Sequence, residues 1–126
     1  MRVIIAGAMA WKDEEAIRQA LRDLPKDTVF IHGDCAGADA LGGKIAAELG
    51  YRVEPYAKNQ DDYQRYKRGA WKGLNERMIA SGADLVLAFH EGFHKSGEAK
   101  GTKHLAKLAA EKGIEVRAFP PPEKIE

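Results

Sequence analysis

Three short runs of consecutive apolar residues stand out along the chain: 3–6, 29–31 and 85–89. Each run is bounded by polar or turn residues and is too short for a helix, which is typical of strands buried on both faces of a sheet. Two further segments, 52–56 and 114–119, alternate apolar and polar residues. The alternation predicts strands at the sheet edges, and Pro55 supports this for the first of them because a central strand tolerates proline poorly.

Four helical patterns separate these strands, each with apolar residues at every third or fourth position. That spacing places the apolar side chains on one face of a helix. The first pattern starts after Asp13, which suits an N-cap, and stops at Pro25; the second ends at Gly50. The third is expected as one continuous helix over 63–78, and the fourth ends at Gly113.

Strands and helices therefore alternate, which predicts an α/β fold with a mainly parallel five-stranded sheet and helices on both faces, a three-layer sandwich. If the alternating strands form the edges, the strand order is 3-2-1-4-5. In such a sheet the chain reverses direction between strands 1 and 4, and ligands bind beyond the carboxyl ends of the strands at this point. We expect one domain over 1–119 and a short Pro-rich tail over 120–126.

Composition narrows the class of protein. The 126 residues suit one domain, and 20 basic against 19 acidic residues give no overall charge that would coat nucleic acid. Cys35 is the only cysteine, which excludes an intramolecular disulfide. With no apolar segment near membrane-spanning length, we expect a cytoplasmic protein without a membrane partner.

Three polar segments that contain glycine each follow a predicted strand: 7–11, 32–39 and 96–102. Glycine lets backbone N–H groups approach an anion closely, and a helix N-terminus adds partial positive charge. Gly101 and Thr102 open the fourth helix, with charge from the neighbouring lysines. We therefore predict a phosphate-binding site with these residues: Gly7, Ala8, Met9, Gly33, Asp34, Gly37, Ala38, Asp39, Asn75, Gly97, Lys100, Gly101, Thr102 and Lys103.

Two carboxylates of the second segment allow alternative roles. Asp34 can shape a turn and Asp39 can cap a helix, or one of them can bind ribose hydroxyls or act as a general base. Asn75 is unfavourable inside a helix, and a contact with a base or phosphate would explain it. Cys35 is disfavoured as a nucleophile. We expect no metal site and no cofactor, since the histidines lack an accompanying carboxylate motif and both the Walker phosphate loop and the dinucleotide fingerprint are missing.

An ordered set of short motifs runs through nearly the whole chain: 1–7, 32–34, 37–39, Asn75 with Met78, 82–89 and 101–102. In this set the chain resembles the YspA/YpsA-related branch of the SLOG superfamily, the SMF/DprA and LOG group. The resemblance implies a Rossmann-like fold that binds nucleotides or nucleotide-derived ligands. LOG members are phosphoribohydrolases, which cleave the N-glycosidic bond of nucleoside monophosphates.

Three positions depart from the patterns of these relatives. Ala8-Met9 stands where the branch commonly has Ser-Arg, and Leu74 where it commonly has Arg. Leu105 occupies the position of the LOG catalytic Glu, which argues against hydrolysis because the transition state needs a nearby carboxylate. The carboxylates that could replace it are Asp34, Asp39 and Glu98.

The leading hypothesis is a module that binds a nucleotide-type ligand as a sensor or carrier. The alternatives are N-glycosidic hydrolysis or transfer, and single-stranded nucleic-acid binding as in the DprA relatives. The latter would use basic residues interleaved with aromatic ones: Lys58, Arg65, Lys67, Arg68, Lys72 and Arg77 with Tyr63, Tyr66 and Trp71. Resemblance to LOG proteins, which pair through helices, also implies a homodimer.

Overall fold

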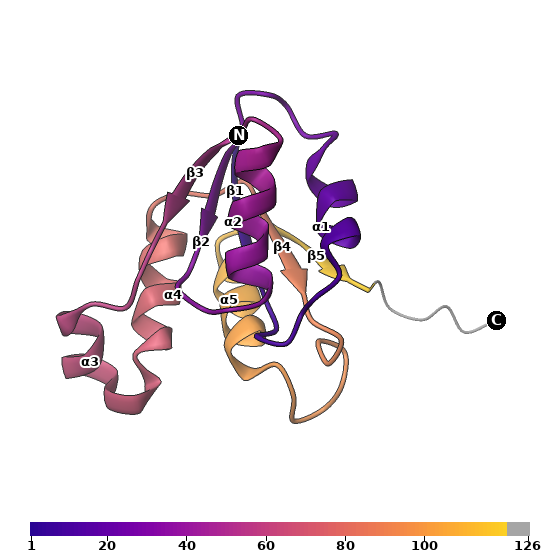
Figure 1. The fold of residues 1–126 in the computed structure, drawn as a ribbon. Coiled ribbons are helices and arrows are strands. Elements are labelled where there is room, and N and C mark those ends of the chain that lie inside the picture. The colour runs from indigo at the N-terminus through magenta and orange to yellow at the C-terminus, as the bar shows by residue number, and fades with distance from the viewer. Residues whose placement is uncertain (121–126) are drawn as a thin grey trace.

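A computed structural model describes residues 1–120 (Figure 1). Its strands are β1 (Arg2–Gly7), β2 (Val29–His32), β3 (Arg52–Pro55), β4 (Leu85–Phe89) and β5 (Glu115–Phe119). Its helices are α1 (Glu14–Leu21), α2 (Ala38–Glu48), α3 (Gln60–Tyr66), the 3-10 helix η1 (Lys67–Gly69), α4 (Trp71–Ala80) and α5 (Lys100–Glu111). The expected tail over 120–126 lies, apart from Pro120, outside the described residues.

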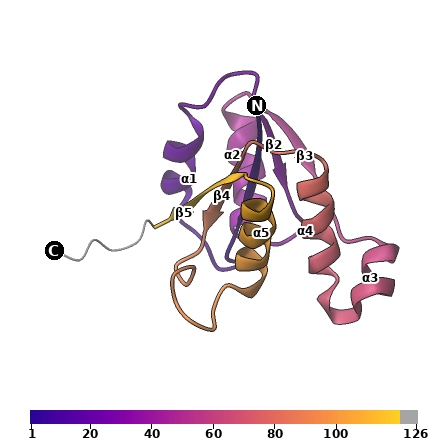
Figure 2. The ribbon, with the colours of Figure 1, turned by 180° about the vertical axis from the view of Figure 1, so that it is seen from behind.

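The sheet has the predicted order, β3-β2-β1-β4-β5, and every pair of neighbouring strands is parallel. Helices α1 and α2 cover one face, while α4 and α5 cover the other (Figures 1 and 2). The expectation of an α/β three-layer sandwich is confirmed. Over residues 1–120 none of the helices combines the length and the apolar character needed to cross a bilayer.

The central strands consist of consecutive apolar residues because both of their faces are buried. In β1, Val3 and Ile5 enter the core beneath α1 and α2, whereas Ile4 and Ala6 enter the core beneath α4 and α5. All five residues of β4 are buried as well. Because all the strands are parallel, their carboxyl ends lie together at one end of the sheet, and the N-termini of α2 and α5 lie at the same end (Figure 1).

The helix expected over 63–78 is broken in the structure, so this prediction is wrong. Helix α3 ends at Tyr66, and Lys67 adopts a left-handed backbone conformation with φ of 55°. A capping box starts α3, with Asn59 and Asp62 exchanging side-chain and backbone hydrogen bonds. Tyr63, which fitted the apolar spacing, is 51% exposed. The true apolar face belongs to α4 alone, and α3 projects from the body of the fold (Figures 1 and 2).

Candidate functional site

Two glycines let the turns after β1, β2 and β4 lie against one another. The amide of Ala8 donates to the Phe89 carbonyl at 2.9 Å, and the amide of Ala38 donates to the Ala8 carbonyl at 3.0 Å. A β-carbon at Gly7 would lie under 3.0 Å from the Phe89 carbonyl, and one at Gly37 would meet the Ala8 carbonyl in the same way. Both positions therefore require glycine, and the predicted convergence of these turns is present in the structure.

A pocket of about 420 Å³ lies where these turns meet the start of α5. We call it the turn pocket. It is lined by Gly7, Ala8, Met9, Cys35, Lys58, Trp71, His90, Ala99, Lys100, Gly101 and Thr102. The residues come from segments far apart in the chain, and most of them lie just beyond the carboxyl ends of the strands.

The first turn of α5 forms one wall of the turn pocket. Ala99 occupies the N-cap position in a left-handed conformation, with φ of 58°, and no side chain caps this helix. The first amides of a helix have no intrahelical acceptor, so the amides of Lys100, Gly101 and Thr102 remain available at the pocket. Thr102 is buried within the first turn. This wall therefore offers backbone donors and the positive end of the helix dipole to an anion.

Asn75 fixes the start of α5 from the neighbouring helix. Its side-chain amide nitrogen donates to the Gly101 carbonyl at 3.0 Å and lies 3.1 Å from Nδ1 of His104. Because that nitrogen can only donate, Nδ1 of His104 accepts. Burial lowers the pKa of His104, which favours the neutral ring, and the rings of His104 and Trp71 pack in a T-shaped arrangement with their centroids 5.3 Å apart. Asn75 is therefore buried as a positioning residue and does not line the pocket.

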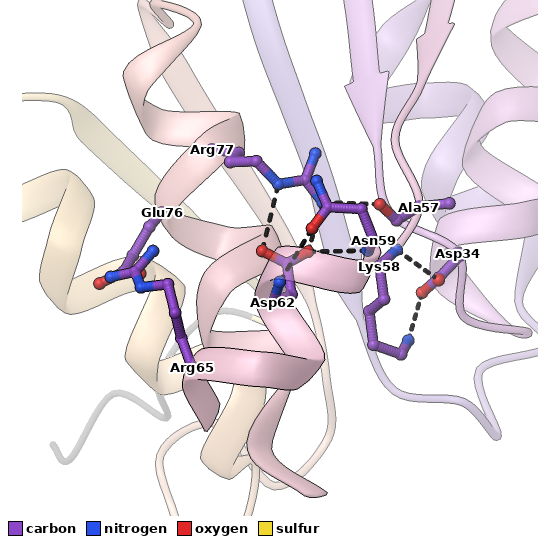
Figure 3. A network of polar contacts seen from close by, with 8 residues as sticks. All are labelled: Asp34, Ala57, Lys58, Asn59, Asp62, Arg65, Glu76 and Arg77. Carbon is purple, nitrogen blue, oxygen red and sulfur yellow. Dashed lines mark hydrogen bonds and ion pairs between the residues drawn. The ribbon is translucent and has the colours of Figure 1, made fainter. Parts of the chain in front are cut away.

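Asp34 holds Lys58 at the pocket (Figure 3). One carboxylate oxygen accepts the Lys58 backbone amide at 2.9 Å, and the other accepts its Nζ at 2.5 Å. Burial acts to raise the pKa of Asp34, but the hydrogen bonds and charge of Lys58 outweigh it and lower the pKa. Asp34 is thus an ionised partner of Lys58, and Lys58 itself lines the turn pocket.

The side chain of Asp39 is buried beneath the turn after β2. It is 7% exposed, and burial raises its pKa to about 7 although the amides of Cys35 and Gly33 favour the ionised form. A β-carbon at Gly33 would lie 2.9 Å from its Oδ2, so glycine leaves room for the carboxyl group. The helix cap is Gly37, not Asp39. Asp39 lies outside the lining of the turn pocket.

Two other cavities adjoin the turn pocket. The switch-point crevice, about 520 Å³, lies between the turns after β1 and β4 and is lined by Ala8, Ala10, Trp11, Lys12, Asp13, His90, Glu91, Gly92, Lys95 and Glu98. The lysine pocket, about 540 Å³, is lined by Trp71, Lys72, Gly97, Glu98, Lys100, Lys103, His104 and Lys107. Trp71 and Lys100 line both the turn pocket and the lysine pocket, so these two pockets are adjacent.

The three candidate catalytic carboxylates do not meet. Asp34 is paired with Lys58, Asp39 lies beneath the turn after β2, and Glu98 lines the other two cavities. None of them lines the turn pocket. Leu105, at the position of the LOG Glu, is 1% exposed in the apolar core. Over residues 1–120 no three His, Cys, Asp or Glu side chains gather as metal ligands would.

Four of the six basic residues in the expected nucleic-acid surface already have a partner within the protein, and Figure 3 shows three of them. The fourth, Lys67, donates to the Gln64 carbonyl. Arg77 contacts the buried carboxylate of Asp62 at 2.5 and 3.3 Å and donates to the Ala57 carbonyl at 2.6 Å. Arg65 lies 3.4 Å from Glu76, and Lys58 is held as described above. Arg65 and Arg77 thus join α3 to α4, while Lys58 is paired with Asp34 in the turn after β2. These pairings weaken the surface as a track for a phosphate backbone.

The structure sorts the predicted ligand residues into three groups. Six line the turn pocket: Gly7, Ala8, Met9, Lys100, Gly101 and Thr102. Gly97 and Lys103 line the lysine pocket. Six lie outside both linings, in supporting positions: Gly33, Asp34, Gly37, Ala38, Asp39 and Asn75.

Five lining residues were missing from the predicted site: Cys35, Lys58, Trp71, His90 and Ala99. His90 directly follows a buried strand, and that position alone was a signal for the sheet edge. Lys58 and Trp71 carried no such signal. They reach the pocket through the turn after β3 and the start of α4, whose boundaries the sequence did not reveal.

Comparison with known proteins agrees with this fold. The model of the YspA, cpYpsA-related SLOG family (YAcAr) matches residues 1–63. The Gene 61 protein of Mycobacterium phage D29 is 32% identical over 125 residues, which cover 94% of this chain and 95% of that protein.

A solved structure gives the same fold. DNA processing protein A (DprA) from Streptococcus pneumoniae has a TM-score of 0.70 at 15% identity, over 96% of this chain and 50% of that chain. This chain thus spans half the length of that DprA chain. The family model and the phage relative carry the assignment, and the chain belongs to the YspA, cpYpsA-related SLOG family.

Proposed function

We propose that this protein binds a nucleotide or a nucleotide-derived ligand in the turn pocket. The observation that carries the proposal is the meeting of three glycine-containing turns with an uncapped helix N-terminus in one pocket. Such an arrangement is a ready-made site for a phosphate group. Membership of the SLOG family agrees with a ligand of this class.

The phosphate would lie at the first turn of α5. Backbone amides of Lys100, Gly101 and Thr102 supply donors there, and the side chains of Lys58 and Lys100 supply positive charge. Asp34 neutralises part of the Lys58 charge but also fixes its position at the rim. A preordered cation costs less conformational entropy on binding than a mobile one.

The base would lie against Trp71. This side chain is half-buried, lines the turn pocket and packs against His104 in a T-shaped arrangement. Stacking of a base on an aromatic ring is worth about 1–3 kcal/mol and tolerates any base. The volume of about 420 Å³ falls within the range of small-molecule sites.

Binding as a sensor or carrier has more support than hydrolysis. Cleavage of an N-glycosidic bond needs a carboxylate beside the sugar, and Asp34, Asp39 and Glu98 all lie outside the lining of the turn pocket. Binding of single-stranded nucleic acid has less support too, since Lys58, Arg65 and Arg77 are engaged in ion pairs.

Isothermal titration against nucleoside monophosphates, nucleoside diphosphates and ADP-ribose tests the proposal. We expect at least one of them to bind with a Kd below about 1 mM. Lys100→Gln should weaken that ligand several-fold, whereas Lys26→Gln, a control far from the turn pocket, should leave it unchanged. No binding to any compound at this concentration, or equal effects of both variants, would contradict the proposal. Release of free base from a monophosphate would favour the hydrolase instead.

A further inference from the structure

The lysine pocket extends the turn pocket along α5 and is strongly basic. Four lysines line it, at positions 72, 100, 103 and 107, against a single acidic residue, Glu98. Lys72 and Lys107 have no ion-pair or hydrogen-bond partner among residues 1–120, whereas Lys103 donates to the Lys95 carbonyl. Positive charge that is not neutralised within the protein attracts an anion from outside.

Trp71 stands between the two compartments. It lines both, and Nζ of Lys72 lies 5.6 Å from its ring centroid. A base stacked on this ring would have the first turn of α5 on one side and the lysines of the second compartment on the other. The ribose of a nucleoside placed in this way would have phosphate-binding groups on two sides, one for a phosphate on the 5′-oxygen and one for a phosphate on the 3′-oxygen.

The basic surface is short. Beyond Lys107 the groove between α4 and α5 is lined by Glu76, Glu111 and Lys112 together with apolar residues, so the run of lysines ends there and charges of both signs follow. A long phosphate backbone would therefore find no continuous row of cations along this groove, whereas a ligand with two phosphates needs only the lysine pocket and the first turn of α5.

We infer that the ligand of this site carries two phosphate groups flanking one nucleoside, as in a nucleoside bisphosphate or one unit of a dinucleotide. One phosphate binds at the first turn of α5 and the other binds Lys72 and Lys107. The inference rests on the proposed function, because it assigns the second half of the same ligand.

Calorimetric titration with adenosine 5′-monophosphate and adenosine 3′,5′-bisphosphate tests the inference on the full chain. We expect the bisphosphate to bind about tenfold more tightly, and this gain to fall with added salt. The double variant Lys72→Gln/Lys107→Gln should lose the gain and keep the affinity for the monophosphate. Lys112→Gln, a control at the end of the same helix, should change neither.

The outcomes separate the two proposals. Equal affinities for the two probes, or a gain that survives in the double variant, would overturn the inference and leave the proposed function standing. Failure of both probes to bind would overturn the inference, whereas the proposed function is contradicted only if the wider panel of nucleotides and ADP-ribose also fails to bind. If a long single-stranded oligodeoxyadenylate binds far more tightly than the bisphosphate, the inference of a small ligand is wrong and the site binds nucleic acid.

Discussion

Gly37 and Ala8 lie so close that the Ala8 carbonyl occupies the space where a side chain at position 37 would begin. The backbone of Gly37 is also left-handed, with φ of 74°. Gly37→Ala combines backbone strain with a clash against a main-chain atom, so it should lower the free energy of unfolding by about 3 kcal/mol or more. Urea denaturation measures this loss.

Gly50→Ala is the matched control for Gly37→Ala. Gly50 has φ of 88°, but no atom lies within 4 Å of a β-carbon built there. It should cost only the backbone strain, about 1–2 kcal/mol. Equal losses in the two variants would show that the turns after β1 and β2 can separate without penalty.

Asp39 should make the protein less stable as the pH rises. Its pKa is about 7 in the folded chain, against an ordinary value of 3.8 when unfolded, so between these values the unfolded state has released the proton that the folded state retains. The free energy of unfolding should therefore fall by on the order of 1 kcal/mol per pH unit between about pH 4 and pH 7. Asp39→Asn should remove this slope and stabilise the protein at pH 8.

Asp34→Asn gives the opposite sign and serves as the comparison. The pKa of Asp34 is lowered in the folded state, so its contribution to stability is present above pH 3.8 and is lost as the pH falls. The variant should be less stable than the parent at pH 8. Chemical denaturation at pH 5 and pH 8 compares the parent protein with Asp34→Asn and Asp39→Asn. If both variants change the free energy of unfolding in the same direction at pH 8, the opposite pKa shifts given to the two carboxylates are wrong.

The ion pair between Asp62 and Arg77 should carry the docking of α3 on α4. Asp62 is 1% exposed and also completes the capping box, so Asp62→Ala loses both interactions and leaves the guanidinium without its partner. We expect a loss of about 3 kcal/mol in the free energy of unfolding. Arg65→Ala breaks a more exposed pair with Glu76 and should cost less than about 1 kcal/mol. Thermal or urea denaturation of the two variants distinguishes these roles.

Asn75→Ala should weaken ligand binding from a position outside the pocket. It removes the donor to the Gly101 carbonyl and to Nδ1 of His104, at a cost of about 1–2 kcal/mol in stability. The nitrogen shifts of His104 in NMR spectra should report the loss of the hydrogen bond to Nδ1. An unchanged imidazole spectrum, together with unchanged nucleotide affinity, would show that Asn75 does not position α5.

The sheet could be predicted from the chain because its signal is local. Continuous apolar runs such as 85–89 mark central strands, and alternation marks the edges, so strand order followed from the pattern alone. The break after α3 could not be predicted in this way. It depends on a left-handed conformation at Lys67, a residue type that rarely adopts one, and on the contact of Asp62 with α4.

The sequence predicted the location of the site more accurately than the side chains that line it. Glycine turns located the edge of the sheet, and Gly7, Gly101 and Thr102 line the turn pocket. The role of Asn75 depends on Gly101, which lies 26 residues further along the chain. Such a partnership exists only once α4 and α5 pack together, and no local pattern contains it.

The outer strands of the sheet bear on how copies of this protein can associate. β3 exposes Arg52 and Pro55, and β5 exposes Glu115 and Arg117. Charged residues and proline at a sheet border discourage the addition of a strand from another molecule. If the protein forms dimers, we therefore expect the two copies to meet through helical surfaces. We do not expect the sheets of successive molecules to join through their outer strands into fibres.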